Sequence, residues 1–157
     1  MTLNKISFFF FLAFMISGTL VPAQNQDDRI VFHYLKLSAA LSRSDLKQAS
    51  RHTEKLAGQV LTSAHSGLFS SAEAMKKASD INQIRQAFSP FSDTLAVLVR
   101  TRKIIAAESL YLVHCPMAFQ DQGADWIADE PKVINPYFGD EMLHCGKVKA
   151  TLFKAGK

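Results

Sequence analysis

The strongest constraint on the fold is a long amphipathic pattern in the middle of the chain. From Ile81 to Ile105, apolar side chains recur three or four residues apart, which places them along one face of a helix. The stripe, in which Arg102 is the one charged member, consists of Ile81, Ile84, Phe88, Phe91, Leu95, Leu98, Arg102 and Ile105. Asp80 is a suitable N-cap, and Pro90 is expected to kink the helix or split it near Ser89.

Three segments before this stripe show the same helical period. They cover residues 30–41, residues 46–64 after a Ser44-Asp45 cap, and a short stretch at 72–78. Short polar links join them, which predicts an antiparallel helical bundle over 28–108 within a mainly α fold. We expect one domain over 24–157, with helices as its scaffold.

Residues 1–23 have the composition of a secretory signal peptide. One positive side chain precedes an apolar run over 6–16, and small residues follow as far as Ala23. At a rise of about 1.5 Å per residue, that run is too short to cross a hydrocarbon core of about 30 Å. We therefore expect cleavage after Ala23 and a periplasmic mature chain that starts at Gln24. An uncleaved membrane anchor is the alternative.

Composition and motifs exclude several classes of function. The chain has 18 basic and 14 acidic residues, a mild excess that is spread along its length without a block of Lys or Arg. We expect no nucleic-acid binding from such a pattern. After residue 23, charges interrupt every apolar stretch, so no membrane span is expected in the mature chain. Neither C-x-x-C nor G-x-S-x-G occurs, and the chain is predicted not to be an enzyme.

The character of the chain changes after Glu108. Residues 110–113 are apolar and β-prone, which predicts a short strand. The stretch 114–136 is rich in Gly, Pro, Asp and aromatic residues and is expected to form an ordered loop. A final helix is expected from 139 or 140 to 153. We expect the whole region 110–153 to carry the chemistry of the protein.

Two short segments of this region concentrate soft metal ligands. Cys115 and Met117 flank a proline, and an extended backbone there would point both side chains to one side and His114 away from it. Met142 and Cys145 are three residues apart and would share one face of the final helix. Two thiolates and two thioethers together favour Cu(I) over Zn²⁺ or a hard cation.

Other interpretations of the same residues remain open. A Cys₂His₂ zinc site lacks its ligand spacings. Cys115 and Cys145 could instead form a disulfide, the default for an exported chain, closing a loop of roughly 30 residues worth about 3–4 kcal/mol. Met117 and Met142 would then be packing residues, and Trp126 either shields a metal ion or is ordinary core. The histidines of the expected helices have no partner at ligand spacing and should be surface or boundary residues: His33, His52 and His65.

Three stretches of this region resemble the DUF3347 family. They are Tyr111-Leu-Val-His-Cys-Pro-Met-Ala-Phe119, Gly123-Ala-Asp-Trp126 and Asn135-Pro-Tyr-Phe-Gly-Asp-Glu-Met-Leu-His-Cys-Gly146. The resemblance covers about residues 28–153, and its specificity lies in 111–146. DUF3347 domains occur as small exported bacterial proteins and fused behind the adaptor subunits of heavy-metal efflux pumps. The resemblance therefore implies metal handling, chiefly of copper, in the cell envelope.

The residues that match motif positions of the family are Cys115, Met117, Met142, Cys145 and His114, whereas His144 falls at a variable position. The resulting hypothesis is a periplasmic Cu(I)-binding protein that acts as a buffer, a carrier or an accessory to metal efflux. The two cysteines and two methionines would hold the ion, with His114 as a substitute ligand. Its partner would be a metal-efflux adaptor or another envelope protein. The alternative is a disulfide-stapled envelope interaction module without metal.

Overall fold

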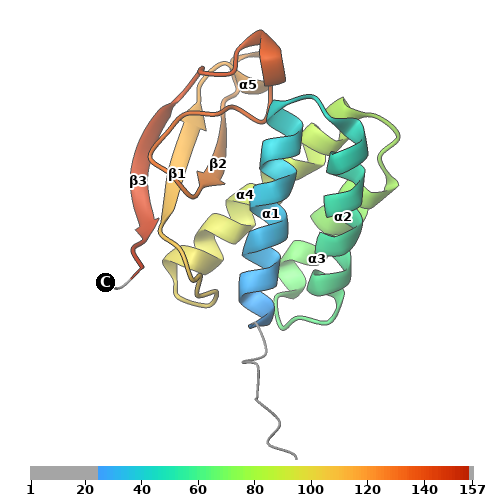
Figure 1. Cartoon of the computed structure of the whole chain (residues 1–157), viewed down its shortest axis with the longest axis vertical. Coiled ribbons are helices and arrows are strands. Elements are labelled where there is room, and N and C mark those ends of the chain that lie inside the picture. The colour runs from blue at the N-terminus through green and yellow to red at the C-terminus, as the bar shows by residue number, and fades with distance from the viewer. Residues whose placement is uncertain (1–24, 156–157) are drawn as a thin grey trace, which may run out of the picture.

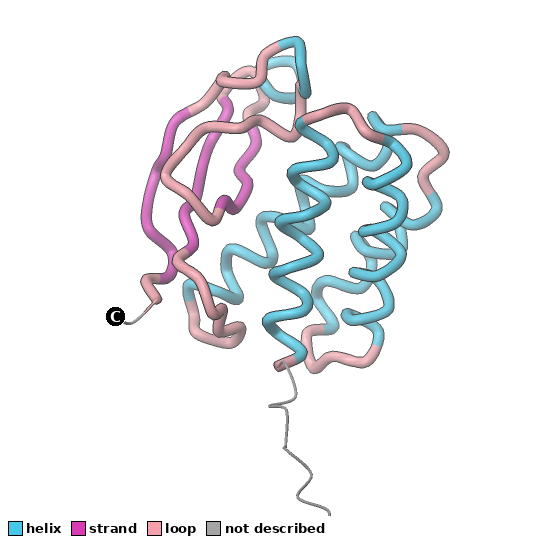
Figure 2. The backbone as a smooth tube through the Cα atoms, in the orientation of Figure 1, coloured by secondary structure: helices cyan, strands magenta, loops and turns pink. Residues whose placement is uncertain are grey.

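The protein is mainly helical and carries a small antiparallel sheet at its C-terminal end. The computed structural model describes residues 25–155, so the predicted export signal over 1–23 lies outside the described part. The helices gather on one side of the molecule, and the three strands lie beside α1 (Gln26–Ser42) and α4 (Ile81–Arg100) (Figure 1). In Figure 2, the first connection between the strands lies at the end of the sheet away from the C-terminus, and the second, longer connection crosses back to that end.

The first two helices are joined by a tight turn that local chemistry explains. Helix α1 (Gln26–Ser42) packs against α2 (Leu46–Leu61). Ser44 has a left-handed φ of 52°. The N–H groups of Ser44 and Asp45 donate to carbonyls in the last turn of α1, which is the hydrogen-bond pattern of a Schellman motif. The carboxylate of Asp45 then accepts a hydrogen bond from the N–H of Gln48 at 3.0 Å. The predicted cap at this position is confirmed.

The central stripe forms one continuous helix as far as Arg100. A short 3₁₀ turn, η1 (Ser66–Leu68), leads into α3 (Phe69–Lys77), and α4 (Ile81–Arg100) follows. Asp80 caps α4 as predicted, because its carboxylate accepts from two N–H groups of the first turn. The expected split at Pro90 is wrong, since α4 runs through it. Pro90 lies on the exposed side of the helix, where water can satisfy the carbonyl that its missing N–H leaves free.

Helix α4 ends earlier than the periodicity predicts. Arg102 has a left-handed φ of 58°, and its N–H donates to the carbonyl of Val99 at 3.1 Å in a second Schellman motif. The expected continuation to Ile105 is therefore wrong, and Ile105 is 54% exposed. Leu98 is only half-buried, while Val99 is fully buried. A Schellman motif usually has Gly at this position, so the sequence carries no signal for the end of the helix.

The C-terminal region forms a sheet, not a loop and a helix. Strands β1 (Leu110–Cys115), β2 (Ala124–Ala128) and β3 (Lys147–Phe153) pair antiparallel in the order β2-β1-β3. The predicted strand at 110–113 is present and two residues longer. The expected helix up to residue 153 is wrong, because the segment pairs with β1 and leaves only a 3₁₀ turn, η2 (Gly139–Glu141), before it. Both β2 and β3 pack against α4.

Tyr34 of α1 ties the helices to the sheet. Its ring stacks on Phe88 and Phe91 of α4, with centroid distances of 4.9 and 6.0 Å. Its hydroxyl lies 2.8 Å from the hydroxyl of Ser92 and accepts the N–H of Ile127 in β2 at 2.9 Å. Burial is the main cause of the raised pKa of Tyr34, so the phenol stays neutral and keeps these hydrogen bonds.

Candidate metal centre

The structure brings the two cysteines together at the end of β1. Cys115 is the last residue of β1 and is fully buried, and Cys145 is half-buried in the turn before β3. Both are free thiols, and their sulfur atoms lie 3.0 Å apart. A disulfide bond measures about 2.05 Å, whereas two thiolates on a tetrahedral ion stand roughly 3.8 Å apart. The observed separation lies between these values, and the predicted proximity of the thiols is confirmed.

A buried asparagine holds the backbone of Cys145. The side-chain amide of Asn135 donates to the carbonyl of Cys145 at 2.8 Å, and its oxygen accepts the N–H of Tyr137 at 2.8 Å. Asn135 is fully buried. Arg85 of α4 anchors the same segment by donating from Nε to the carbonyl of Pro136 at 3.0 Å. Sequence reasoning assigned no role to Asn135, and its place in an Asn-Pro-Tyr-Phe stretch was the only available signal.

Gly146, the residue after Cys145, lies against the backbone of His114 and the ring of Trp126. Gly146 has a φ of 140°, and a Cβ atom there would lie 2.7 Å from the carbonyl oxygen of His114 and 3.0 Å from Cη2 of Trp126. Only glycine fits so close an approach without displacing backbone. Trp126 is 1% exposed and packs edge-on against Tyr137, with ring centroids 6.0 Å apart. Trp126 is therefore part of the core.

The pKa of the Cys145 thiol is raised. The main cause is its hydrogen bond with the Cys115 thiol, followed by burial, while a bond from the backbone N–H of Met117 acts in the opposite direction. A raised pKa keeps the thiol protonated near neutral pH, so a metal ion must displace a proton to bind. Cys145 borders an open cavity of about 260 Å³, with Pro116 and Lys147 also in its lining. The cavity is open to solvent, and Cys145 is the cysteine of the pair that lines it.

Both methionines flank the cysteine pair, but not in the way the spacing predicted. Met117 lies in a turn with φ −90° and ψ −7°, so the extended backbone expected around Pro116 is wrong, and its side chain is 47% exposed while Cys115 is fully buried. Met142 has φ −142° and ψ 56°, so it shares no helical face with Cys145. Its carbonyl accepts the N–H of Cys145 at 3.0 Å. Both methionines therefore reach Cys145 through backbone hydrogen bonds.

His114 belongs to a different cluster. It precedes Cys115 in β1, and alternation along the strand turns its ring to the opposite face. His114 Nδ1 lies 2.6 Å from Asp125, whose other carboxylate oxygen accepts from Lys149 at 3.2 Å. Sequence reasoning missed Asp125 as a partner, because the pair arises from the β1–β2 register. His144 is also apart from the cysteines, with Nδ1 3.0 Å from the carbonyl of Val133.

The turn after the Cys-Pro-Met segment is strained. Phe119, Gln120 and Asp121 have φ values of 53°, 59° and 63°, so the short element α5 (Ala118–Asp121) is left-handed where its sequence has no glycine. A left-handed Phe is a genuine outlier, and such strain persists only where surrounding structure enforces it. Here the Phe119 ring packs edge-on against Tyr137 at 5.3 Å. The packing connects this turn to the segment that holds Cys145.

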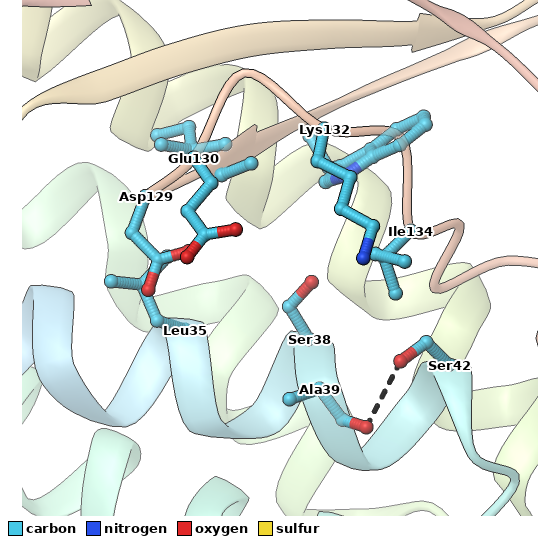
Figure 3. Close-up of a pocket in the computed structure, with 11 residues that line it drawn as sticks. Leu35, Ser38, Ala39, Ser42, Asp129, Glu130, Lys132 and Ile134 are labelled. Carbon is cyan, nitrogen blue, oxygen red and sulfur yellow. Dashed lines mark hydrogen bonds between the residues drawn. The ribbon is translucent and has the colours of Figure 1, made fainter. Parts of the chain in front are cut away.

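A separate cavity of about 180 Å³ lies between α1 and the loop after β2 (Figure 3). Asp129 and Glu130 stand at one side of it and Lys132 at the other, over Ser38 and Ser42 of α1. None of the predicted metal ligands lines this cavity, so it is distinct from the cysteine centre.

Within residues 25–155, no three His, Cys, Asp or Glu side chains form a group that could hold a metal ion. A metal at the cysteine pair would therefore need methionine or external ligands. No helix in the same range is long and apolar enough to cross a membrane.

Comparison with known proteins identifies one family. A family model described as "Protein of unknown function (DUF3347)" matches residues 30–106. The match covers the helical part, whereas the stretches that carried the resemblance, 111–146, lie outside it. No curated protein and no solved structure matches the chain.

Proposed function

We propose that this protein is periplasmic and binds Cu(I) at Cys115 and Cys145. The chain belongs to the DUF3347 family through residues 30–106. It would act as a buffer, a carrier or an accessory to metal efflux, without catalytic activity. The observation that carries the proposal is the 3.0 Å separation of the two free thiols beside a surface opening. The family is described as one of unknown function, so the support comes from the chemistry of the site.

The donor set suits a soft, singly charged ion. Thiolates are the strongest soft ligands that proteins offer, and thioethers add affinity for Cu(I) without adding charge. Met117, exposed and bonded through its backbone to Cys145, is a candidate for a third ligand. Met142, whose carbonyl is bonded to the same residue, is the fourth. His114 has no ligand role in this proposal, because its Nδ1 is engaged by Asp125 on the other face of β1.

Binding would require a small adjustment of the site. The sulfur atoms must separate by roughly 0.8 Å to hold a tetrahedral ion, and each thiol must lose its proton. The side chain of Cys145 has more room to move than that of Cys115, since Cys145 is half-buried and only its backbone is held by hydrogen bonds, while Cys115 is fully buried in β1. Affinity should therefore increase with pH, because the thiol of Cys145 has a raised pKa.

The 3.0 Å distance between the two sulfur atoms also favours a second candidate function. The sulfur atoms need to approach by only about 1 Å to form a disulfide, which would staple the 142–146 turn to the sheet. The chain would then be an envelope interaction module without metal. In either case, the partner would be a metal-efflux adaptor or another envelope protein.

The experiment that separates these functions is a Cu(I) titration of the reduced protein against a competing chelator, read beside a free-thiol count on protein purified from its envelope. We expect the reduced protein to bind one Cu(I) and the oxidised protein none. Met117→Leu and Met142→Leu each keep the side-chain volume and remove a soft donor. We expect each to weaken Cu(I) binding at least tenfold, about 1.4 kcal/mol, with little change in melting temperature.

Met75→Leu is the matched control. Met75 is 1% exposed in α3, remote from the cysteines in the sequence, and its replacement should affect packing without affecting Cu(I) binding. Failure of the reduced protein to compete with a weak chelator would eliminate the copper site. Wild-type affinity in both Met→Leu variants would eliminate the thioether ligands. An oxidised, metal-free native protein would favour the stapled module.

A further inference from the structure

Two histidines that are far apart in the sequence meet across the contact of α1 with α2. His33 lies on α1 and His52 on α2, and their Nδ1 atoms are 3.3 Å apart. Their ring centroids are 5.5 Å apart, and both side chains are half-buried. The expectation that these histidines are surface or boundary residues is confirmed, but each has the other as a partner. The sequence could not indicate the pair, because it depends on how the two helices pack.

The separation of the two nitrogens is the one that a tetrahedral metal ion requires. Two nitrogens at about 2.0 Å from such an ion stand about 3.3 Å apart. We propose that His33 and His52 form a second metal site, in which the two Nδ1 atoms bind a borderline divalent ion of the Zn²⁺ or Cu²⁺ class. Imidazole nitrogen suits these ions, whereas the cysteine pair suits a soft ion. The two sites would therefore take ions of different chemistry.

The protonation state of the pair is compatible with this role. Burial lowers the pKa of both histidines, and their mutual repulsion and nearby Lys55 lower that of His33 further. Neutral imidazole is the form that binds metal. The direct contact requires a proton on one Nδ1, and metal binding would move that proton to Nε2 through solvent. The ring changes tautomer, and no net proton is released.

External ligands must complete the shell. No third His, Cys, Asp or Glu joins the pair in the described part of the chain, so two positions are left for water or an anion. Within residues 25–155, the side chains whose charge lowers the pKa of the pair include Lys36, Lys55 and Arg51. They oppose a bare divalent ion and favour an anionic co-ligand such as chloride or a carboxylate. We therefore expect moderate affinity that is higher when such an anion is present.

The site is tested by Zn²⁺ titration of the whole chain, with histidine ring ¹⁵N chemical shifts as the readout. We expect the Nδ1 signals of His33 and His52 to shift together, and His33→Gln and His52→Gln each to weaken this binding event at least tenfold. His65→Gln is the matched control, because His65 is paired with Asp27 at 3.0 Å and should leave Zn²⁺ binding at the pair unchanged.

The ring signals separate this site from the cysteine centre. The Cu(I) affinity of the reduced protein should be unaffected by His33→Gln, so each site can fail without the other. The proposal is overturned if the His33 and His52 signals do not respond to Zn²⁺ up to about 1 mM. A dissociation constant of that size corresponds to a binding free energy of about 4 kcal/mol. It is also overturned if both Gln variants bind Zn²⁺ as the wild type does.

Discussion

Asn135→Ala should destabilise the protein and loosen Cys145 at the same time. The substitution removes the acceptor of the buried Tyr137 N–H and the donor to the carbonyl of Cys145, both at 2.8 Å. Leaving a buried N–H without a partner costs about 1–3 kcal/mol, and losing the second hydrogen bond costs about 1 kcal/mol. We therefore expect a loss of about 2–4 kcal/mol in the free energy of unfolding.

Urea unfolding followed by tryptophan fluorescence measures this loss, because the chain has a single tryptophan, Trp126, which borders the turn of Cys145. The same variant should react faster than the wild type with a thiol reagent at Cys145, since its backbone is less restrained. Gln122→Ala, at an exposed position, is the control and should change neither quantity. A stability change below about 0.5 kcal/mol would refute the role assigned to the Asn135 hydrogen bonds.

Two further predictions test the helices. Leu95→Asp should prevent folding, because Leu95 is fully buried in α4 and an unpaired buried charge costs several kcal/mol. Val97 is 55% exposed, so Val97→Asp is the control and should leave the far-UV CD melt nearly unchanged. Equal melts for the two variants would show that the register of α4 is wrong. The pKa values of His33 and His52 are lowered in the folded protein, so the unfolded chain binds protons more readily than the folded one. The free energy of unfolding should therefore be at its full value above about pH 6.5 and should decrease as the pH falls below it. His33→Gln should reduce that acid sensitivity in urea titrations at several pH values; an unchanged slope would contradict it.

Local signals were sufficient to predict the four main helices and the starts of two of them, whereas α1 and α3 begin earlier than the apolar pattern indicated. Asp45 and Asp80 cap α2 and α4 as expected, because a cap depends on residues two or three positions away. The end of α4 was not predictable in the same way. Its Schellman motif has Arg102 in the left-handed position that glycine usually occupies, so the apolar stripe continued in the sequence beyond the end of the helix.

The candidate site was predicted in part, and partly for the wrong reason. Cys115 and Cys145 were expected to meet, and they do, but the face of a final helix that was expected to present Cys145 does not exist. Strand pairing of β1 with β3 and the amide of Asn135 bring Cys145 to Cys115. The motif stretch around Asn135 drew attention to the right segment without revealing its geometry.

The sequence by itself determined the helical scaffold and two of its caps, because periodicity and capping act over a few neighbouring residues, and it showed where the soft Cys and Met side chains are concentrated. Only the tertiary structure decided which of these side chains meet. Cys115 and Cys145 are 30 residues apart in the chain, and His33 and His52 are 19 apart. Such contacts depend on how whole elements pack and pair, and the free energy of that packing is distributed over the entire core.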